Sequence, residues 1–195
     1  MERKTETKEY IKIAFTKLLK EKGFNNITVS DITREAGINR GTFYLHYVDK
    51  FDLLEKLEND SIEDLKKILL NKTMHESSDL NEIFPYSMLV EALNYAKDNF
   101  DFVSALASEN GDPKFNDKFK KIMTALLKLR LNHIDKTKAA EVGIPSDYVY
   151  EILVSTPIAI ILMWIKKGGI ESPKKIAKII TATKKYSPND FLKLI

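Results

Sequence analysis

Residues 27–54 read ITVSDITREAGINRGTFYLHYVDKFDLL, and the helix signals in this stretch decide the fold. Thr28 precedes Asp31 by three residues, the spacing at which two side chains cap the first turn of a helix. Gly37 supplies the positive φ that a sharp turn needs, and Asn39 is placed to cap a second helix. The stretch therefore predicts a short helix, a tight turn, a second short helix and the start of a longer one.

Outside this stretch, apolar residues recur every three or four positions, which is the period of a buried helix face. No segment alternates with the period of two that strands need. We predict an all-α fold of about nine helices, over residues 6–22, 28–36, 39–47, 49–70, 83–97, 100–109, 114–138, 147–167 and 173–186. Residues 1–50 are predicted to form a three-helix domain, and residues 51–195 a larger helical domain.

The composition excludes several kinds of site. The 195 residues include no cysteine, which excludes disulfides, thiol catalysis and thiolate metal ligands. His46, His75 and His133 are far apart and have no carboxylate at ligand spacing, so we predict no metal and no cofactor. No glycine-rich phosphate loop, nucleophile elbow or acid pair is present, and we do not expect an enzyme.

The chain has the composition of a soluble protein, with 44% hydrophobic and 30% charged residues. Its N-terminal residues, MERKTETKEY, lack the apolar region of a signal peptide. The longest apolar run, residues 152–165, is shorter than the roughly 20 residues that cross a bilayer. We therefore predict a cytoplasmic protein without a membrane partner. The net charge of +3 is mild, so any case for DNA binding depends on where the charges lie.

The segment NRGTFYLHY, residues 39–47, has the features of a helix that enters the major groove of DNA. In a helix-turn-helix the second helix contacts base edges with its first residues. Arg40 can pair with guanine, and Thr42 can meet a thymine methyl group or a phosphate. Gly41 permits close approach, and Phe43 is predicted to point inward. Donors to phosphate are predicted at Tyr44, His46, Tyr47 and Lys50.

Three of these residues also have simpler interpretations. Arg40 can be a solvated surface cation, Tyr44 can pack between helices, and His46 can be a hydrogen-bonded structural histidine.

The stretch resembles the DNA-binding domain of the TetR (tetracycline repressor) family of bacterial transcription regulators. The matching residues are Thr28-Val29, Ile32, Ala36-Gly37, Gly41 to Tyr44, His46-Tyr47, Lys50 and Leu53-Leu54. Further along, Trp164, Gly168-Gly169 and Ser172-Pro173 are similar to the end of TetR-type regulators from low-GC Gram-positive bacteria. Pro157 departs from that pattern, and we expect it to kink its helix and free a carbonyl near Leu153.

The resemblance implies a homodimer whose last two long helices pack with their mates in a four-helix bundle. It also implies a repressor that binds a palindromic operator in double-stranded DNA and is released by a small-molecule effector. Residues 51–195 would then be the regulatory and dimerisation domain. The DNA contacts implied are Thr28, Ser30, Asn39, Arg40, Gly41, Thr42, Tyr44, His46 and Lys50, with base reading assigned to Arg40, Thr42 and Ser30.

The rest of the chain offers a candidate effector site and a candidate dimer contact. Aromatic and methionine side chains in this part fit either a packed core or a cavity for a small apolar or aromatic effector. For the cavity, the candidate residues are Tyr86, Met88, Glu91, Phe100, Phe102, Phe119 and Met123. Met163 and Trp164 are predicted at the dimer interface.

The alternative function is a TetR-like co-regulator that acts through protein contacts without reading DNA. The intact 39–47 segment argues against this alternative.

Overall fold

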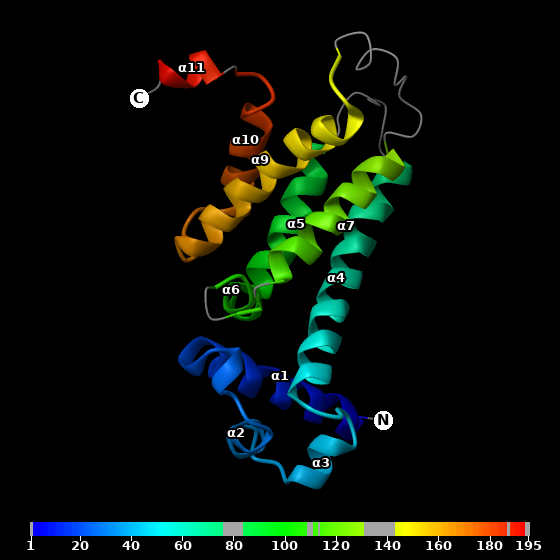
Figure 1. Cartoon of the computed structure of the whole chain (residues 1–195), viewed down its shortest axis with the longest axis vertical. Helices are drawn as coiled ribbons and strands as arrows, with labels where there is room; N and C mark the ends of the chain where they lie inside the picture. Colours follow the sequence, from blue (N-terminus) through cyan, green and yellow to red (C-terminus); the bar gives the residue numbers. More distant parts are fainter. Residues whose placement is uncertain are drawn as a thin grey trace. The chain divides into compact units, whose positions relative to one another are not determined.

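The computed structural model describes residues 2–75, 84–108, 111–112, 114–130, 143–186 and 188–193. Its elements are α1 (Glu2–Lys22), the 3₁₀ turn η1 (Phe24–Asn26), α2 (Val29–Glu35), α3 (Arg40–Tyr44), α4 (Lys50–His75), α5 (Tyr86–Asp98), α6 (Phe100–Ala107), α7 (Phe115–Arg130), α9 (Ser146–Lys166), α10 (Pro173–Ala182) and α11 (Pro188–Leu192). Within these ranges every regular element is helical, which confirms the all-α prediction (Figure 1).

Several helix boundaries differ from those predicted. The third helix ends at Tyr44 rather than near residue 47, and the chain then turns before α4. The last predicted helix ends at Ala182, and the short α11 follows it as an additional helix. The predicted end of a helix at residue 138, and His133, lie outside the described residues.

The described chain forms two compact units. The N-terminal unit comprises residues 1–64 and 99–115, and the C-terminal unit comprises residues 65–98 and 116–195. The N-terminal unit thus includes the first part of α4 and, from further along the chain, α6. The predicted functional division after residue 50 stays a prediction, because it concerns which residues bind DNA rather than which residues pack together.

The core of the N-terminal unit forms where α1, α2, α3 and α6 meet the first turns of α4. Its buried residues are Ile11, Phe15, Leu18, Leu19, Ile27, Ile32, Phe43, Tyr47, Leu53, Leu54, Leu57, Phe102, Ala105 and Leu106. The last three belong to α6, which packs against α1. Lys20 of α1 forms an ion pair with Asp101, and the Lys12 ammonium lies 5.4 Å from the centre of the Phe102 ring.

Gly111 brings the chain back tightly against the end of α6. Its N–H donates to the carbonyl of Ser108 at 3.0 Å. A Cβ atom at this position would lie 2.1 Å from the carbonyl oxygen of Leu106, which is far inside van der Waals contact. Because that oxygen belongs to the backbone and cannot rotate away, we infer that only glycine fits here.

In the C-terminal unit, α10 packs against both α5 and α9 (Figure 1). α5 buries Met88, Leu89 and Leu93, and α10 buries Ile176, Ala177 and Ile180. Two lysines bind backbone carbonyls nearby: Lys97 of α5 donates to the Gly169 carbonyl at 2.8 Å, and Lys184, two residues after α10, donates to the Phe84 carbonyl at 2.9 Å. Ser172 caps α10 and Pro173 is its first residue, as the sequence predicts.

α9 is a long apolar helix with a proline inside it. The helix runs unbroken from Ser146 to Lys166, with Pro157 buried inside it. It has 21 residues, and an 18-residue stretch of it has a mean hydropathy of 1.8, which is long and apolar enough to cross a membrane by length and composition alone. The helix is longer than the apolar run of residues 152–165, but one helix of this kind is weak evidence for a membrane span. A core helix of a soluble protein has the same length and composition, and 28% of this 18-residue stretch is buried within the chain.

Candidate nucleic-acid interface

The turn between α2 and α3 is built as the sequence predicts. Gly37 has a φ of 66°, the left-handed conformation that glycine adopts without strain. The N–H of Gly37 donates to the backbone carbonyl of Arg34 at 3.3 Å, and the N–H of Ile38 donates to the backbone carbonyl of Thr33 at 3.0 Å. These bonds close the end of α2, so that α3 begins only three residues after Gly37.

A complete capping box fixes the start of α2. The N–H of Asp31 donates to the Thr28 hydroxyl at 3.2 Å, and the N–H of Thr28 donates to the Asp31 carboxylate at 3.1 Å. Lys22 and Arg34 also pair with that carboxylate, at 3.1 and 2.7 Å. The hydrogen bond from the Thr28 side chain, followed by that from Lys22, holds the pKa of Asp31 well below its usual range. Asp31 is therefore charged at neutral pH and complements the helix N-terminus.

We expect Thr28→Ala to destabilise the folded chain by about 1 kcal/mol, because the first turn of α2 loses its side-chain acceptor. Urea unfolding followed by circular dichroism measures the change as a lower midpoint at constant slope. Thr28→Ser keeps the hydroxyl and serves as the control, with a midpoint close to that of the wild type. Equal midpoints for the alanine variant and the wild type would show that the capping box contributes nothing to stability.

Asn39 caps α3 and also holds the side chain of Thr42. Its side-chain oxygen accepts from the N–H of Thr42 at 2.7 Å and from the Thr42 hydroxyl at 3.1 Å. Phe43 is fully buried in the core of the N-terminal unit, as predicted. Tyr44 is exposed, and its ring meets that of Phe43 edge-on with 5.6 Å between the centroids.

Arg40 is exposed at the first turn of α3, and its guanidinium donates to the hydroxyl of Ser30 on α2. Two residues assigned to base reading are therefore in contact, although ten positions separate them in sequence. Gly41 is exposed beside Arg40. This hydrogen bond holds the Arg40 guanidinium against α2 and restricts the orientations of the side chain.

Two predicted phosphate donors have partners within the chain instead. Tyr47 is only 5% exposed and packs 5.6 Å from Phe43, centroid to centroid, and burial raises the pKa of its hydroxyl to about 12. We therefore assign Tyr47 to the core. The Lys50 ammonium donates to two backbone carbonyls of η1. His46 is half-buried, with its ring 6.2 Å from that of Tyr47.

The residues predicted to line an effector cavity do not gather in one unit. Phe100 and Phe102 belong to the N-terminal unit, where Phe102 is part of the core. The others lie in the C-terminal unit, on α5 (Tyr86, Met88 and Glu91) and on α7 (Phe119 and Met123). Met88 and Met123 are buried, and the Tyr86 hydroxyl donates to the carbonyl of Lys174 at 3.4 Å.

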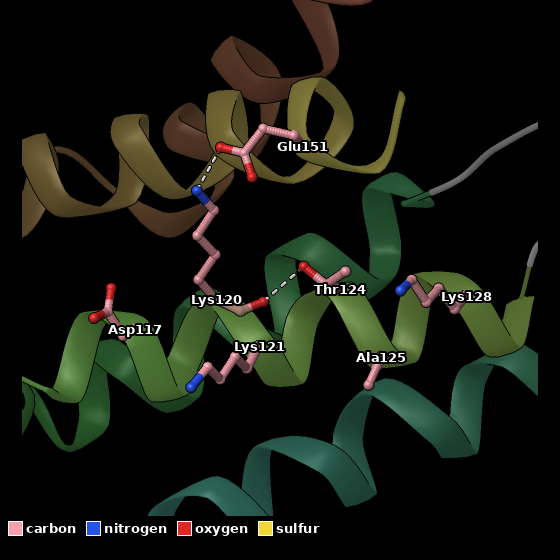
Figure 2. Close-up of a pocket in the computed structure, with 7 residues that line it drawn as sticks. All are labelled: Asp117, Lys120, Lys121, Thr124, Ala125, Lys128 and Glu151. Carbon is pink, nitrogen blue, oxygen red and sulfur yellow. Dashed lines mark hydrogen bonds and ion pairs between the residues drawn. The ribbon is translucent and has the colours of Figure 1, made fainter. Parts of the chain in front are cut away.

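A hollow of about 390 Å³ runs along one face of α7 beside α9 and is lined mainly by charged side chains (Figure 2). Its lining residues are Asp117, Lys120, Lys121, Thr124, Ala125, Lys128 and Glu151. Lys120 reaches across to Glu151 at 2.5 Å, and this bond, followed by one from Ser155, lowers the pKa of the Glu151 carboxyl. The hollow contains none of the predicted effector-site residues and differs from the apolar cavity that was expected.

The two predicted dimer contacts have different surroundings. Trp164 is 1% exposed, and its indole N–H donates to the Glu171 carbonyl at 2.9 Å across the turn that ends α9. We therefore correct its assignment from the dimer interface to the core of its own chain. Met163 is 60% exposed, so its place at the dimer interface stays a prediction. Gly168 and Gly169, with φ of 81° and 64°, form the turn that brings Glu171 back beneath the indole.

The fold and this interface together define a class of protein. A capped α2, a glycine turn and a capped α3 that exposes arginine at its start form a helix-turn-helix. A model of the family described as "Bacterial regulatory proteins, tetR family" matches residues 14–57. A second, described as "Transcriptional regulator C-terminal region", matches residues 85–185, more than half of the chain. The chain belongs to the TetR family of transcription regulators, which are DNA-binding proteins and not enzymes.

Individual relatives agree with this assignment. An uncharacterised helix-turn-helix regulator, YxbF of Bacillus subtilis, is 26% identical over 86% of this chain and 42% of its own length. The transcriptional repressor BepR of Brucella suis is 36% identical over 27% of this chain and 25% of its own length. The chain thus spans less than half the length of either relative. A TetR-family regulator from Syntrophomonas wolfei has the same fold, with a TM-score of 0.65 and 18% identity over 93% of this chain and 94% of its own.

Proposed function

We propose that this chain is a transcriptional repressor that binds a palindromic operator as a homodimer and is released by a small-molecule effector. The observation that carries the proposal is the exposed Arg40 at the start of α3, held by Ser30 and supported by two capped helices. The repressor role is supported by the 36% identity of 52 residues of this chain to the repressor BepR. The proposed place of action is the cytoplasm, where bacterial DNA lies.

The proposed DNA contacts fall into two groups. Arg40 and Thr42 read base edges, with Ser30 beside them on α2. Phosphates are bound around this centre, and the proposed residues are Thr28, Asn39, Gly41, Tyr44 and His46. Contacts of both kinds are needed, because phosphate contacts fix the register and base contacts supply the sequence preference.

The proposed dimer contact is the exposed face of α9. Ile152, Thr156, Ala159 and Met163 are all exposed and follow one another at spacings of four, three and four residues, which places them on one side of the helix. The face combines two large apolar side chains with two small residues that let another helix approach closely. A second copy of α9, together with α10, would cover this surface in a four-helix bundle.

The effector is proposed to be small and apolar or aromatic and to bind in the C-terminal unit, near the predicted residues of α5 and α7. It releases the operator only if it binds the DNA-free arrangement more tightly than the DNA-bound one. The coupling is then reciprocal, so operator DNA weakens effector binding by the same factor.

Selection of bound sequences from random double-stranded DNA tests the proposal. We expect enrichment of a palindrome whose half-sites lie about 34 Å apart, one turn of DNA. Affinity for the selected operator should fall steeply with salt, because each phosphate contact releases counterions. If the intact dimer enriches no sequence, the repressor proposal fails and the co-regulator alternative gains support.

Ile152→Asp tests the dimer contact. We expect the variant to be monomeric at micromolar concentration in sedimentation, because a charge would have to be buried against the partner helix. Its operator affinity should fall at least about 100-fold, since each half-site is then bound alone. The matched control is Ile170→Asp, which makes the same change at an 84% exposed position in the turn after α9. A dimeric Ile152→Asp variant would exclude this face as the contact.

A further inference from the structure

Lys50, the first residue of α4, makes contacts that are unusual for a cation predicted to bind phosphate. Its ammonium donates to the carbonyl of Phe24 at 3.0 Å and to the carbonyl of Asn25 at 3.1 Å. Both carbonyls belong to η1, the turn between α1 and α2. A side chain on α4 therefore binds backbone that lies 25 and 26 positions earlier in the chain.

Two aromatic rings complete the surroundings of this ammonium. It lies 4.9 Å from the centre of the Phe24 ring and 5.5 Å from that of Phe51. The rings themselves meet edge-on at 5.2 Å, and Phe24 also contacts the buried Phe15 edge-on at 6.3 Å. We call the two carbonyls and the rings of Phe24 and Phe51 the Lys50 cage. Carbonyl oxygens and ring faces both attract a cation, so the cage holds the ammonium against η1.

The position of the cage gives it a structural consequence. η1 follows Gly23, which has a φ of 73° and comes directly after the last residue of α1. The last residue of η1 precedes Thr28, the residue that caps α2, by two positions. The backbone that Lys50 binds is thus the short connection that sets where α2 starts. Because α3 follows α2 through a bonded turn, holding η1 also holds the recognition helix relative to the start of α4.

We propose that Lys50 is a positioning residue, which fixes the helix-turn-helix on the first turn of α4 and does not itself neutralise a DNA phosphate. The inference rests on the proposed function for its DNA readout. It replaces the sequence-based role of Lys50, in which the cation binds phosphate at the N-terminus of α4. Rotation of the start of α4 then carries α2 and α3 with it, because the cage joins η1 to the first turn of α4.

The test uses Lys50→Met in the full-length dimer, compared with the wild type at a temperature where both are folded. We expect operator affinity to fall about tenfold or more, while the slope of log K against log salt stays unchanged. The preference for the best half-site spacing over operators one base pair longer or shorter should weaken, because the recognition helices are held less firmly. Lys50→Arg keeps the charge and the donors and should recover most of the affinity.

Lys56→Met is the matched control. Lys56 is on the same helix, and its ammonium contacts Asp52 at 2.8 Å and the His46 carbonyl at 3.3 Å, whereas Lys50 contacts η1. Its loss removes the same charge and should leave both the affinity and the spacing preference close to wild type. The role of Lys50 as a positioning residue is overturned if Lys50→Met binds as the wild type does. It is also overturned if the salt slope becomes shallower by about 0.9 for each lost contact, which is the signature of a phosphate contact.

Hydrogen exchange separates this inference from the proposed function. Amides of residues 24–31 should exchange faster in Lys50→Met, while those of α9 and α10 should keep their wild-type rates. Unchanged exchange at residues 24–31 would overturn the inference without reference to DNA. If instead the exchange changes as expected but the wild type selects no operator, the proposed function fails. The structural role of Lys50 in holding η1 is then still supported.

Discussion

Replacing Arg40 by alanine is expected to remove specific operator binding and leave the folded dimer intact. A bidentate contact between arginine and guanine contributes about 1–3 kcal/mol, and the proposed homodimer loses two of them, so affinity should fall at least about 30-fold. The stability should barely change, because Arg40 is exposed and its partner Ser30 stays accessible to water. Fluorescence anisotropy against the selected operator and a scrambled duplex measures both specific and non-specific affinity.

Arg34→Ala is the control for this experiment. Arg34 is also an exposed arginine of the helix-turn-helix, but it pairs with Asp31 on its own helix at 2.7 Å. Both variants lose one positive charge, so both should lose a similar small part of the non-specific affinity. Only Arg40→Ala should lose the difference between operator and scrambled DNA. Wild-type operator affinity in the Arg40 variant would reject the assignment of Arg40 as the main base-reading residue.

Trp164→Ala is expected to cause the largest loss of stability, about 3–5 kcal/mol. The indole is almost completely buried and bonded to Glu171, so its removal leaves both a cavity and an unpaired carbonyl. Trp164→Phe keeps most of the apolar volume and should lose about 1–2 kcal/mol, chiefly the hydrogen bond. Denaturant unfolding of each variant at one fixed protein concentration measures the losses.

Met163→Ala separates packing within the chain from the contact between chains. Met163 is exposed next to Trp164, so its truncation should change unfolding of the single chain by no more than about 0.5 kcal/mol. It should instead weaken dimerisation, which sedimentation at several concentrations detects. The reverse pattern, in which Trp164→Phe weakens the dimer and Met163→Ala does not, would return Trp164 to the interface.

The parts of the site that the sequence predicted well are local in sequence. The capping box of Thr28 and Asp31, the turn at Gly37 and the cap at Asn39 each involve residues within three or four positions of one another. Their chemistry depends on backbone geometry that a short helix imposes by itself. Spacing alone was therefore enough to place α2 and α3, although the end of α3 was predicted too late.

The contacts that the sequence did not predict join distant segments. Lys50 has the residue type and position of a phosphate ligand, and only the fold brings η1 within its reach. Burial of Tyr47 and Trp164 raises the same difficulty, because periodicity shows that a side chain is apolar but not whether its own chain or a partner covers it. The bond between Ser30 and Arg40 likewise depends on the angle between α2 and α3.

The packing of α6 has a consequence for the order in which the chain folds during synthesis. Phe102, Ala105 and Leu106 are part of the core that also contains Phe15 and Phe43. The ribosome must therefore release the chain beyond residue 106 before the helix-turn-helix can reach its final packing. A nascent chain of the first 64 residues would contain every proposed DNA contact and still lack one wall of its core. The N-terminal unit thus reaches its final packing only after part of the second half of the chain has been synthesised.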